Sequence, residues 1–224
     1  VDPLTVCAAA FSDGDNVLAF VSFDVVIVEW PYVERVRAGI AEAAGRIRQD
    51  IPPQNILVCA THNHACPAVV DRPGSAKDEA YLDFMVERGI EAGVAALERM
   101  SPGEIGVGRG YEVRVGFNRR YIKLDGTVVS QPATTEGLLC SEGVTDPGLG
   151  VVCFRDASTG QRHTLVNYSC HVCHHMGQLS AGYPGVMRGQ LRESLGMESV
   201  CVFLNGACGN VLHASQPWMS PPPG

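Results

Sequence analysis

The sequence ILVCATHNHACP, Ile56–Pro67, sets the expectations for the rest of the chain. Its first half is an apolar run with β-branched residues, which is typical of a buried strand. Two histidines follow, His62 and His64, and residues two apart on a strand point to the same side. The pattern predicts two imidazoles together at the carboxyl end of a strand, the edge where open α/β sheets place their ligand sites.

This histidine pair has two interpretations that the stretch itself leaves open. Neutral imidazole is a common metal ligand and titrates near neutral pH, so the pair could bind a metal or act in catalysis. Alternatively, the two rings could simply be held by local hydrogen bonds at a strand end.

The segments that flank the histidines predict an α/β fold. Leu4–Phe11 and Asn16–Val28 resemble two strands joined by a turn, and a helical pattern begins at Pro31. A helix between two strands usually links parallel strands, so this unit is expected to be a crossover. We therefore expect a mixed, largely buried β-sheet flanked by α-helices at about 32–49 and 79–100, with a metal site at one sheet edge.

The second half of the chain is expected to hold further strands and one helix. Gly150–Arg155 and His163–Tyr168 have the pattern of a β-hairpin, and Ser199–Leu204 that of a buried strand. Tyr183–Leu195 is expected to be a helix with proline in its first turn. Pro132–Gly150 is rich in Gly, Thr, Ser and Pro, which predicts a long loop, and such loops are often functional.

Composition limits the classes of function. The chain has 224 residues, 46% of them hydrophobic and 18% charged, which suits one large domain, or one and a half, with ample core. The formal net charge is -7 and no basic run stands out, so no nucleic-acid partner is expected. The apolar runs are too short to cross a bilayer. The odd number of cysteines, 9, with several in strand-like runs, favours a reducing compartment, and we expect a cytoplasmic protein.

A second cluster of ligand-type residues, SCHVCHH, occupies Ser169–His175. CHVCH within it fits the C-x-x-C-H spacing for covalent haem. Its two cysteines could bind structural zinc, but no second C-x-x-C completes a four-cysteine set. In a third interpretation His171 leaves the strand end and meets His62. The fourth is that these histidines are satisfied by local backbone groups.

Several short motifs occur along the chain in a fixed order. They are ATHNHACP at Ala60–Pro67, FNRR at Phe117–Arg120, NYSCH at Asn167–His171, SAGYPG at Ser180–Gly185 and FLNGACGN at Phe203–Asn210. The set resembles the N-terminal domain of the neutral/alkaline non-lysosomal ceramidase family, whose motifs include A-T-H-T-H-S-G-P and S-A-D-Y-P-G. The resemblance covers Val1 to about Val211.

The resemblance implies a zinc-dependent amidohydrolase that acts on a small-molecule or lipid-like amide. His62 would be the first zinc ligand and His171 the second. His64 would lie beside the metal-bound water or the substrate, and Arg119 would reach the substrate or the developing oxyanion. Zinc lowers the pKa of bound water to about 7, and the resulting hydroxide attacks the carbonyl carbon. The alternative for Arg119 is a solvated or ion-paired surface residue.

The family completes its zinc site with a Glu and a Tyr beyond the glycine-rich turn. We therefore expect 1–214 to be an N-terminal catalytic domain that is incomplete at both ends, followed by a loose, Pro-rich segment at 215–224. Leu212 stands where ceramidases carry a Ser, and Gly182 where they carry an Asp. These departures favour an amide or ester other than ceramide itself. They also leave open a non-catalytic module that keeps the fold for binding or assembly.

Overall fold

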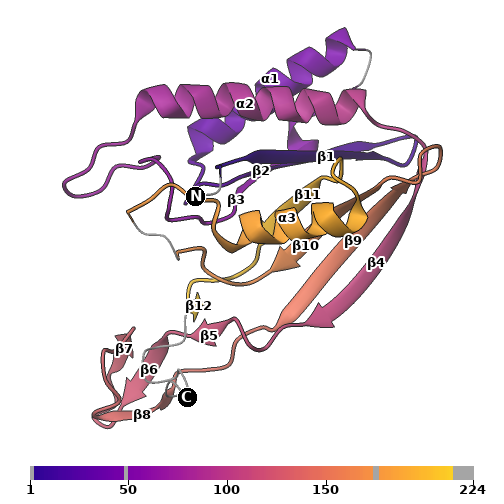
Figure 1. The fold of residues 1–224 in the computed structure, drawn as a ribbon. Coiled ribbons are helices and arrows are strands. Elements are labelled where there is room, and N and C mark those ends of the chain that lie inside the picture. The colour runs from indigo at the N-terminus through magenta and orange to yellow at the C-terminus, as the bar shows by residue number, and fades with distance from the viewer. Residues whose placement is uncertain (1–2, 48–49, 174–176, 214–224) are drawn as a thin grey trace.

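Four layers of secondary structure are stacked in the computed structural model, which describes residues 3–47, 50–173 and 177–213 (Figure 1). The outer layers are helical: α1 (Trp30–Arg46) and α2 (Glu79–Glu98) on one side and α3 (Gly182–Leu195) on the other. The first inner sheet has the order β1 (Val6–Ser12), β2 (Val17–Phe23), β3 (Ile56–Ala60). The second has the order β11 (Cys201–Asn205), β10 (Arg162–Tyr168), β9 (Gly148–Asp156), β4 (Gly103–Tyr111).

The first sheet contains the predicted crossover. β1 and β2 are antiparallel, β2 and β3 are parallel, and α1 with the short 3-10 helix η1 (Pro53–Asn55) connects the parallel pair. Side chains of β2 alternate as a strand requires. Val21 and Phe23 face the helices, while the buried hydroxyl of Ser22 donates a hydrogen bond of 2.6 Å to the carbonyl of Phe203 in the second sheet. The predicted α/β fold with mixed sheets is confirmed, and β2 ends at Phe23, five residues before the expected end at Val28.

The expected single sheet is divided into two sheets that meet face to face. Alternate residues of β10 and β11 point to opposite faces of the second sheet. Leu165 and Val202 pack toward β1, whereas Val166 and Phe203 pack toward α3. β10 is antiparallel to β9, as the hairpin pattern predicts, and parallel to β11. A strand that is apolar on both faces must be covered on both faces, which explains why this sheet lies inside the stack.

Short strands below the layers correct the prediction of a long loop over Pro132–Gly150. The segment contains β8 (Leu138–Ser141) and the beginning of β9. β8 joins a small sheet of order β7 (Val128–Ser130), β6 (Arg120–Lys123), β8, and β5 (Phe117–Asn118) pairs with β12 (Val211–Leu212). All of these strands are short, and β7 and β8 are largely exposed, so they lack the buried apolar run that signals a strand in sequence.

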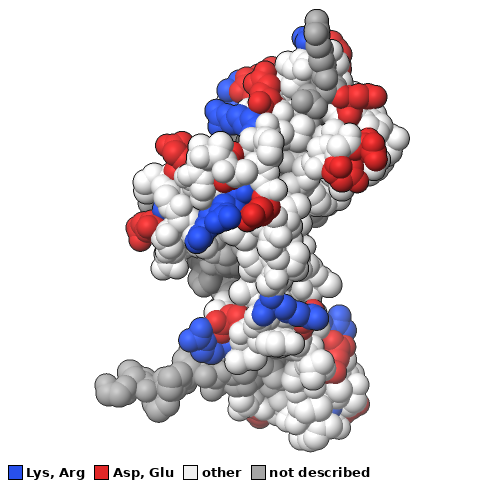
Figure 2. All heavy atoms as spheres, turned by 90° about the vertical axis from the view of Figure 1, so that its right-hand side faces the viewer, with Lys and Arg blue, Asp and Glu red and all other residues white. Residues whose placement is uncertain are grey.

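One face of the molecule shows its outline and how its charges are distributed. Figure 2 shows a narrowing between the layered part and the small strands beneath it. On this face Lys and Arg are interspersed with Asp and Glu. Among the helices of the described residues, none has the length and apolar character needed to cross a membrane. The segment 215–224, expected to be loose, lies outside the described residues.

A buried ion pair joins α3 to the end of β2. The guanidinium of Arg188 donates to Oδ2 of Asp24, and the two side chains are 5% and 1% exposed. The same carboxylate oxygen accepts hydrogen bonds from the backbone N–H (3.0 Å) and the hydroxyl (2.8 Å) of Thr5. The pair therefore ties the outer helix of one sheet to a strand end of the other.

Arg188→Met is expected to lower the free energy of unfolding by about 3–5 kcal/mol, because it leaves the carboxylate of Asp24 buried without its cation. Urea denaturation of the wild type, the two single variants and Asp24→Asn/Arg188→Met measures the effect. The double variant should recover much of the loss. A single-variant cost below about 1 kcal/mol would show that the pair is not structurally important.

Candidate metal centre

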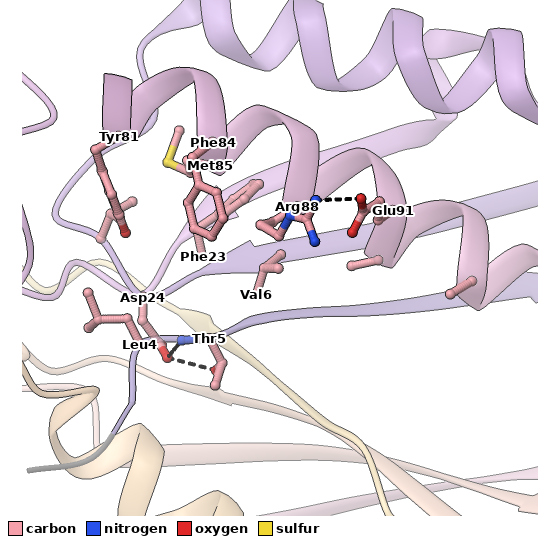
Figure 3. Close-up of a pocket in the computed structure, with 13 residues that line it drawn as sticks. Leu4, Thr5, Val6, Phe23, Asp24, Tyr81, Phe84, Met85, Arg88 and Glu91 are labelled. Atoms are coloured by element: carbon pink, nitrogen blue, oxygen red, sulfur yellow. Dashed lines mark hydrogen bonds and ion pairs between the residues drawn. The ribbon is translucent and has the colours of Figure 1, made fainter. Parts of the chain in front are cut away.

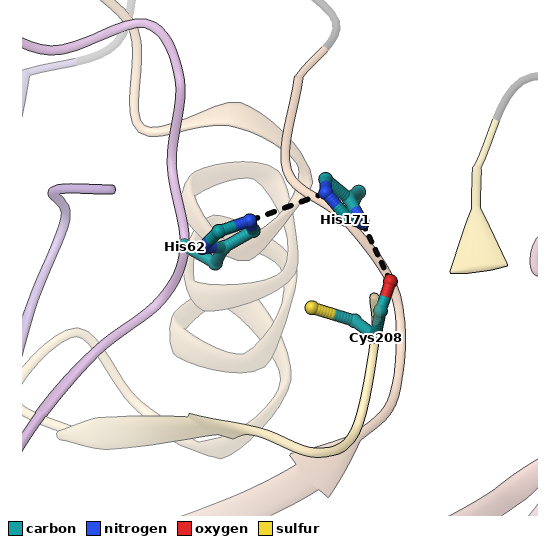
Figure 4. Close-up of side chains that lie close together, drawn as sticks. All are labelled: His62, His171 and Cys208. Atoms are coloured by element: carbon teal, nitrogen blue, oxygen red, sulfur yellow. Dashed lines mark hydrogen bonds between the residues drawn. The ribbon is translucent and has the colours of Figure 1, made fainter. Parts of the chain in front are cut away.

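Three segments meet at one place, and each begins where a strand ends (Figure 4). His62 follows β3, His171 follows β10 and Cys208 follows β11. β3 is parallel to β2, and β10 is parallel to β11. Parallel strands have their carboxyl ends at the same edge of their sheet, so β10 and β11 bring the His171 segment and the Cys208 turn together. The His62 loop of the first sheet joins them through a bridge between Asn63 and Val172.

The histidines lie as the sequence predicts, although for a different reason. Nε2 of His62 is 3.2 Å from Nε2 of His171 and 3.3 Å from Nε2 of His64. Strand alternation does not bring His62 and His64 together, because β3 ends at Ala60 and His62 has a φ of 64°. This correction places both rings on a loop, which is anchored by an isolated parallel bridge between Asn63 and Val172.

The left-handed backbone of His62 is held by its neighbours. The N–H groups of Thr61 and Asn63 donate to the carbonyls of Phe23 (2.9 Å) and Val25 (3.0 Å), so the chain on either side continues to bond to the end of β2. A positive φ at a non-glycine residue costs on the order of 1–3 kcal/mol and is concentrated at functional sites. At His62 the positive φ accompanies a ring that is directed toward His171.

Backbone carbonyls fix which nitrogen of each ring carries the proton. Nδ1 of His62 is 2.9 Å from the carbonyl oxygen of Val26, and Nδ1 of His171 is 2.6 Å from that of Cys208. A carbonyl oxygen can only accept, so each Nδ1 must carry the hydrogen. A neutral imidazole has one N–H, which leaves a lone pair on Nε2 of both rings. Two lone pairs facing each other repel unless a cation lies between them, and this donor set fits a metal ion.

The side-chain amide of Asn205 joins the two histidine-bearing segments. Its Nδ2 donates to the carbonyls of Thr61 (2.8 Å) and Cys170 (2.9 Å), and its Oδ1 accepts from the N–H of Cys170 (3.2 Å). Thr61 and Cys170 directly precede His62 and His171. One side chain at the end of β11 thus holds the backbone next to both rings.

His64 lies on the other side of His62. Its N–H donates to the carbonyl of Val172 at 2.8 Å. Burial, with the neighbouring His62 and His171, lowers the pKa of His64 from 6.5 to about 4. Burial also lowers the pKa of His171. Both rings are therefore neutral near pH 7, the form in which imidazole binds a metal or accepts a proton.

Arg119 reaches the site from the small strands below. It lies between β5 and β6, and its N–H donates to the carbonyl of Asn210 at 2.8 Å. Its charge acts to lower the pKa of His64, His171 and Cys208, which indicates that the guanidinium is close to all three. Among the described residues its buried Nε has no hydrogen-bond partner. An unpartnered buried donor is costly, and it favours a functional role over the surface alternative.

Cys208 is the member of the site that the sequence analysis missed. Within the described residues, the ligand atoms of His62, His171 and Cys208 all lie within 4.8 Å of one another. Burial raises the pKa of the Cys208 thiol. Its position in a glycine-rich turn directly after a buried strand was the available signal, because that turn ends at the same edge as the two histidine loops.

The CHVCH segment is only partly described. His174 and His175 lie outside the described residues. Cys170 is fully buried, and the sulfur of Cys173 is 3.4 Å from Nε2 of His213. In the described part of the chain, neither cysteine belongs to a group of three close metal-ligating atoms, and His171 is directed to His62. The geometry favours the interpretation in which His171 meets His62.

The two departures from the ceramidase motifs have structural counterparts. Leu212 is buried in β12 opposite Phe117, so an apolar side chain stands where the motif has a hydroxyl. Gly182 has a φ of 63°, and a Cβ there would lie 2.4 Å from Cγ1 of Val172. An aspartate would not fit at this position without movement of the backbone or of Val172.

No protein-family profile and no curated protein matches the chain. Solved structures do match. Neutral ceramidase from Pseudomonas aeruginosa superposes with a TM-score of 0.69 at 17% identity, over 94% of this chain and 34% of the ceramidase. This chain has a ceramidase-like fold. A second structure, described as ceramidase complexed with C2, gives a TM-score of 0.67 at 16% identity over 90% of this chain and 31% of that one.

The ceramidase-like fold is the one that the resemblance of the motifs implies. The chain spans about a third of the length of the two ceramidase structures. At this low identity the likeness concerns the fold, and the chemistry has to be argued from the site.

Asn205→Ala should lower the free energy of unfolding by about 1–3 kcal/mol, because Cys170 N–H and two carbonyls lose their partner. It should also weaken zinc binding about 10- to 100-fold, as the loss of supporting hydrogen bonds does at other metal sites. Urea denaturation and zinc titration measure the two effects. Asn167→Ala is the matched control, since Asn167 is exposed and its amide donates one bond, to the carbonyl of Leu204. Equal zinc affinity in Asn205→Ala and the wild type would contradict a positioning role.

Proposed function

We propose that this chain carries the metal-binding part of a zinc-dependent hydrolase that cleaves an amide, such as a ceramide-like N-acyl bond, or a related bond. One observation carries the proposal. Nε2 of His62 and Nε2 of His171 are 3.2 Å apart, and backbone carbonyls hold the proton of each ring on the opposite nitrogen. Two adjacent, fixed lone pairs suit a cation of the zinc type.

His62 and His171 would hold the zinc ion. When bound, zinc supplies a Lewis acid that activates water and polarises a carbonyl group. The contacts from His62 to Val26 and from His171 to Cys208 and Val211 orient the rings before any ion arrives. Such preorganisation lowers the cost of binding and keeps the ligand geometry constant during the reaction.

Arg119 would bind the carbonyl oxygen of the substrate. Its buried Nε lacks a partner among the described residues, so a substrate oxygen would satisfy it. A cationic donor is worth most where negative charge develops, so this contact would strengthen as the carbonyl carbon becomes tetrahedral.

His64 would transfer a proton. The ring is neutral at pH 7 because its pKa is lowered to about 4. A neutral ring could accept the proton that the attacking water releases and pass the same proton to the leaving amine.

The substrate is proposed to be an N-acyl amide or ester other than ceramide itself. The matched structures are named ceramidases, which supports an acyl-amide class. Leu212 supplies no hydroxyl where the family motif has Ser, so the part of the site that this residue borders should differ. Two features favour a hydrolase over a non-catalytic binding module. They are the unpartnered Nε of Arg119 and the facing lone pairs on Nε2 of His62 and His171, neither of which such a module needs.

The purified protein should contain about one zinc ion per chain by elemental analysis, and His62→Ala should lose it. Hydrolysis of a panel of N-acyl amides and esters should depend on zinc.

Arg119→Ala should lower kcat about 10²- to 10³-fold, as the removal of one oxyanion donor does.

Arg120→Ala is the matched control, because Arg120 is exposed and paired with Glu142 at 2.6 Å. It should retain wild-type kcat. A protein that binds no zinc and hydrolyses none of the panel would contradict the proposed function. Equal losses in the two arginine variants would remove Arg119 from the mechanism.

A further inference from the structure

The sulfur of Cys208 is a third atom of a metal-binding type close to the rings of His62 and His171. It lies with one ring nitrogen each of His62 and His171 in a group of ligand atoms that are all within 4.8 Å of one another, on the side of the turn that faces His62 (Figure 4). We infer that Cys208 supplies a thiolate ligand, so that two histidines and one cysteine form a three-ligand site for metals of the zinc class. This inference rests on the proposed function and deepens it.

The spacing of the donor atoms supports the assignment. With Zn–N bonds of about 2.0–2.1 Å and a Zn–S bond of about 2.3 Å, neighbouring ligands of a tetrahedral zinc lie about 3.3–3.6 Å apart. The two imidazole nitrogens are already 3.2 Å apart. The thiol sulfur lies within 4.8 Å of the other ligand atoms, so it would have to move by up to about 1.2 Å to complete the site.

The backbone of Cys208 is coupled to one of the ligands. Its carbonyl contacts Nδ1 of His171 at 2.6 Å and accepts a second hydrogen bond from the N–H of Val211 at 3.0 Å. The residue that offers the sulfur therefore also orients the ring of His171. A single tight turn holds both groups, so they move together.

His64 is the competing third ligand. Nε2 of His64 is 3.3 Å from Nε2 of His62. Within the described residues, however, His64 does not belong to the group of mutually close ligand atoms that contains His171 and Cys208. A tetrahedral ion needs all of its donors near one another. Cys208 meets this requirement better and leaves His64 available for the substrate side.

A thiolate ligand has two chemical consequences. The thiol releases its proton to solvent as the metal–sulfur bond forms, so binding becomes pH-dependent. Sulfur and imidazole favour Zn²⁺ and Co²⁺, whereas Mg²⁺ and Ca²⁺ prefer oxygen ligands. The site should therefore discriminate strongly against Mg²⁺ and Ca²⁺.

Cobalt substitution tests the inference directly. Metal-depleted wild type titrated with Co²⁺ should show visible d–d bands together with a sulfur-to-cobalt charge-transfer band in the near ultraviolet. Cys208→Ser should keep the d–d bands, lose the charge-transfer band and bind Co²⁺ at least about 10-fold more weakly. Cys173→Ser, which alters another half-buried thiol near the site, should behave like the wild type.

A second readout needs no substitution. Alkylation of Cys208 by iodoacetamide, followed by peptide mass spectrometry, should be slowed by Zn²⁺ and unchanged by Mg²⁺. Cobalt bands without the charge-transfer band, or alkylation unaffected by Zn²⁺ at saturation, would overturn thiolate ligation while the hydrolase proposal stands. The absence of any cobalt band in the wild type would overturn both.

Discussion

Two imidazole nitrogens without protons face each other at 3.2 Å, and the surrounding structure is organised to keep them there. Each ring is fixed by a hydrogen bond from Nδ1 to a backbone carbonyl, so neither can turn its N–H toward the other without losing a buried contact. Such an arrangement is unfavourable in isolation. The proposed cation would accept both lone pairs and make the arrangement favourable, and it would offset the cost of the left-handed backbone at His62.

The layered architecture supplies this arrangement through two parallel strand pairs. β3 and β10 each deliver a histidine loop, and Asn205 at the end of β11 holds the residues that precede both histidines. The buried pair of Arg188 and Asp24 joins α3 to the first sheet near the same edge. By contrast, the cavity of about 530 Å³ between α2 and the start of β1 is lined by residues such as Tyr81 and Met85 and by none of the site histidines (Figure 3). The chemistry of side chains, rather than cavity size, therefore locates the site.

Local patterns predicted most of the layered part of the fold. The crossover through α1, the hairpin of β9 and β10, and the helix at Gly182–Leu195 have strong periodic signals, because each buries an apolar face. The short strand β8 was missed because it is largely exposed. The sequence predicted His62 and His64 on one side of the chain, and the meeting of His171 with His62 was one of several interpretations. The turn after a buried strand was a signal for Cys208, but its contact with His62 depends, as that of His171 does, on how two separate sheets are aligned.

The central claim is that a metal ion joins His62 and His171, and anomalous diffraction tests it most directly. Crystals of the protein grown with zinc would be measured on both sides of the zinc absorption edge. The account predicts an anomalous peak about 2.0–2.1 Å from Nε2 of both histidines. A map without a peak at saturating zinc, with the two rings joined by a direct hydrogen bond, would contradict it.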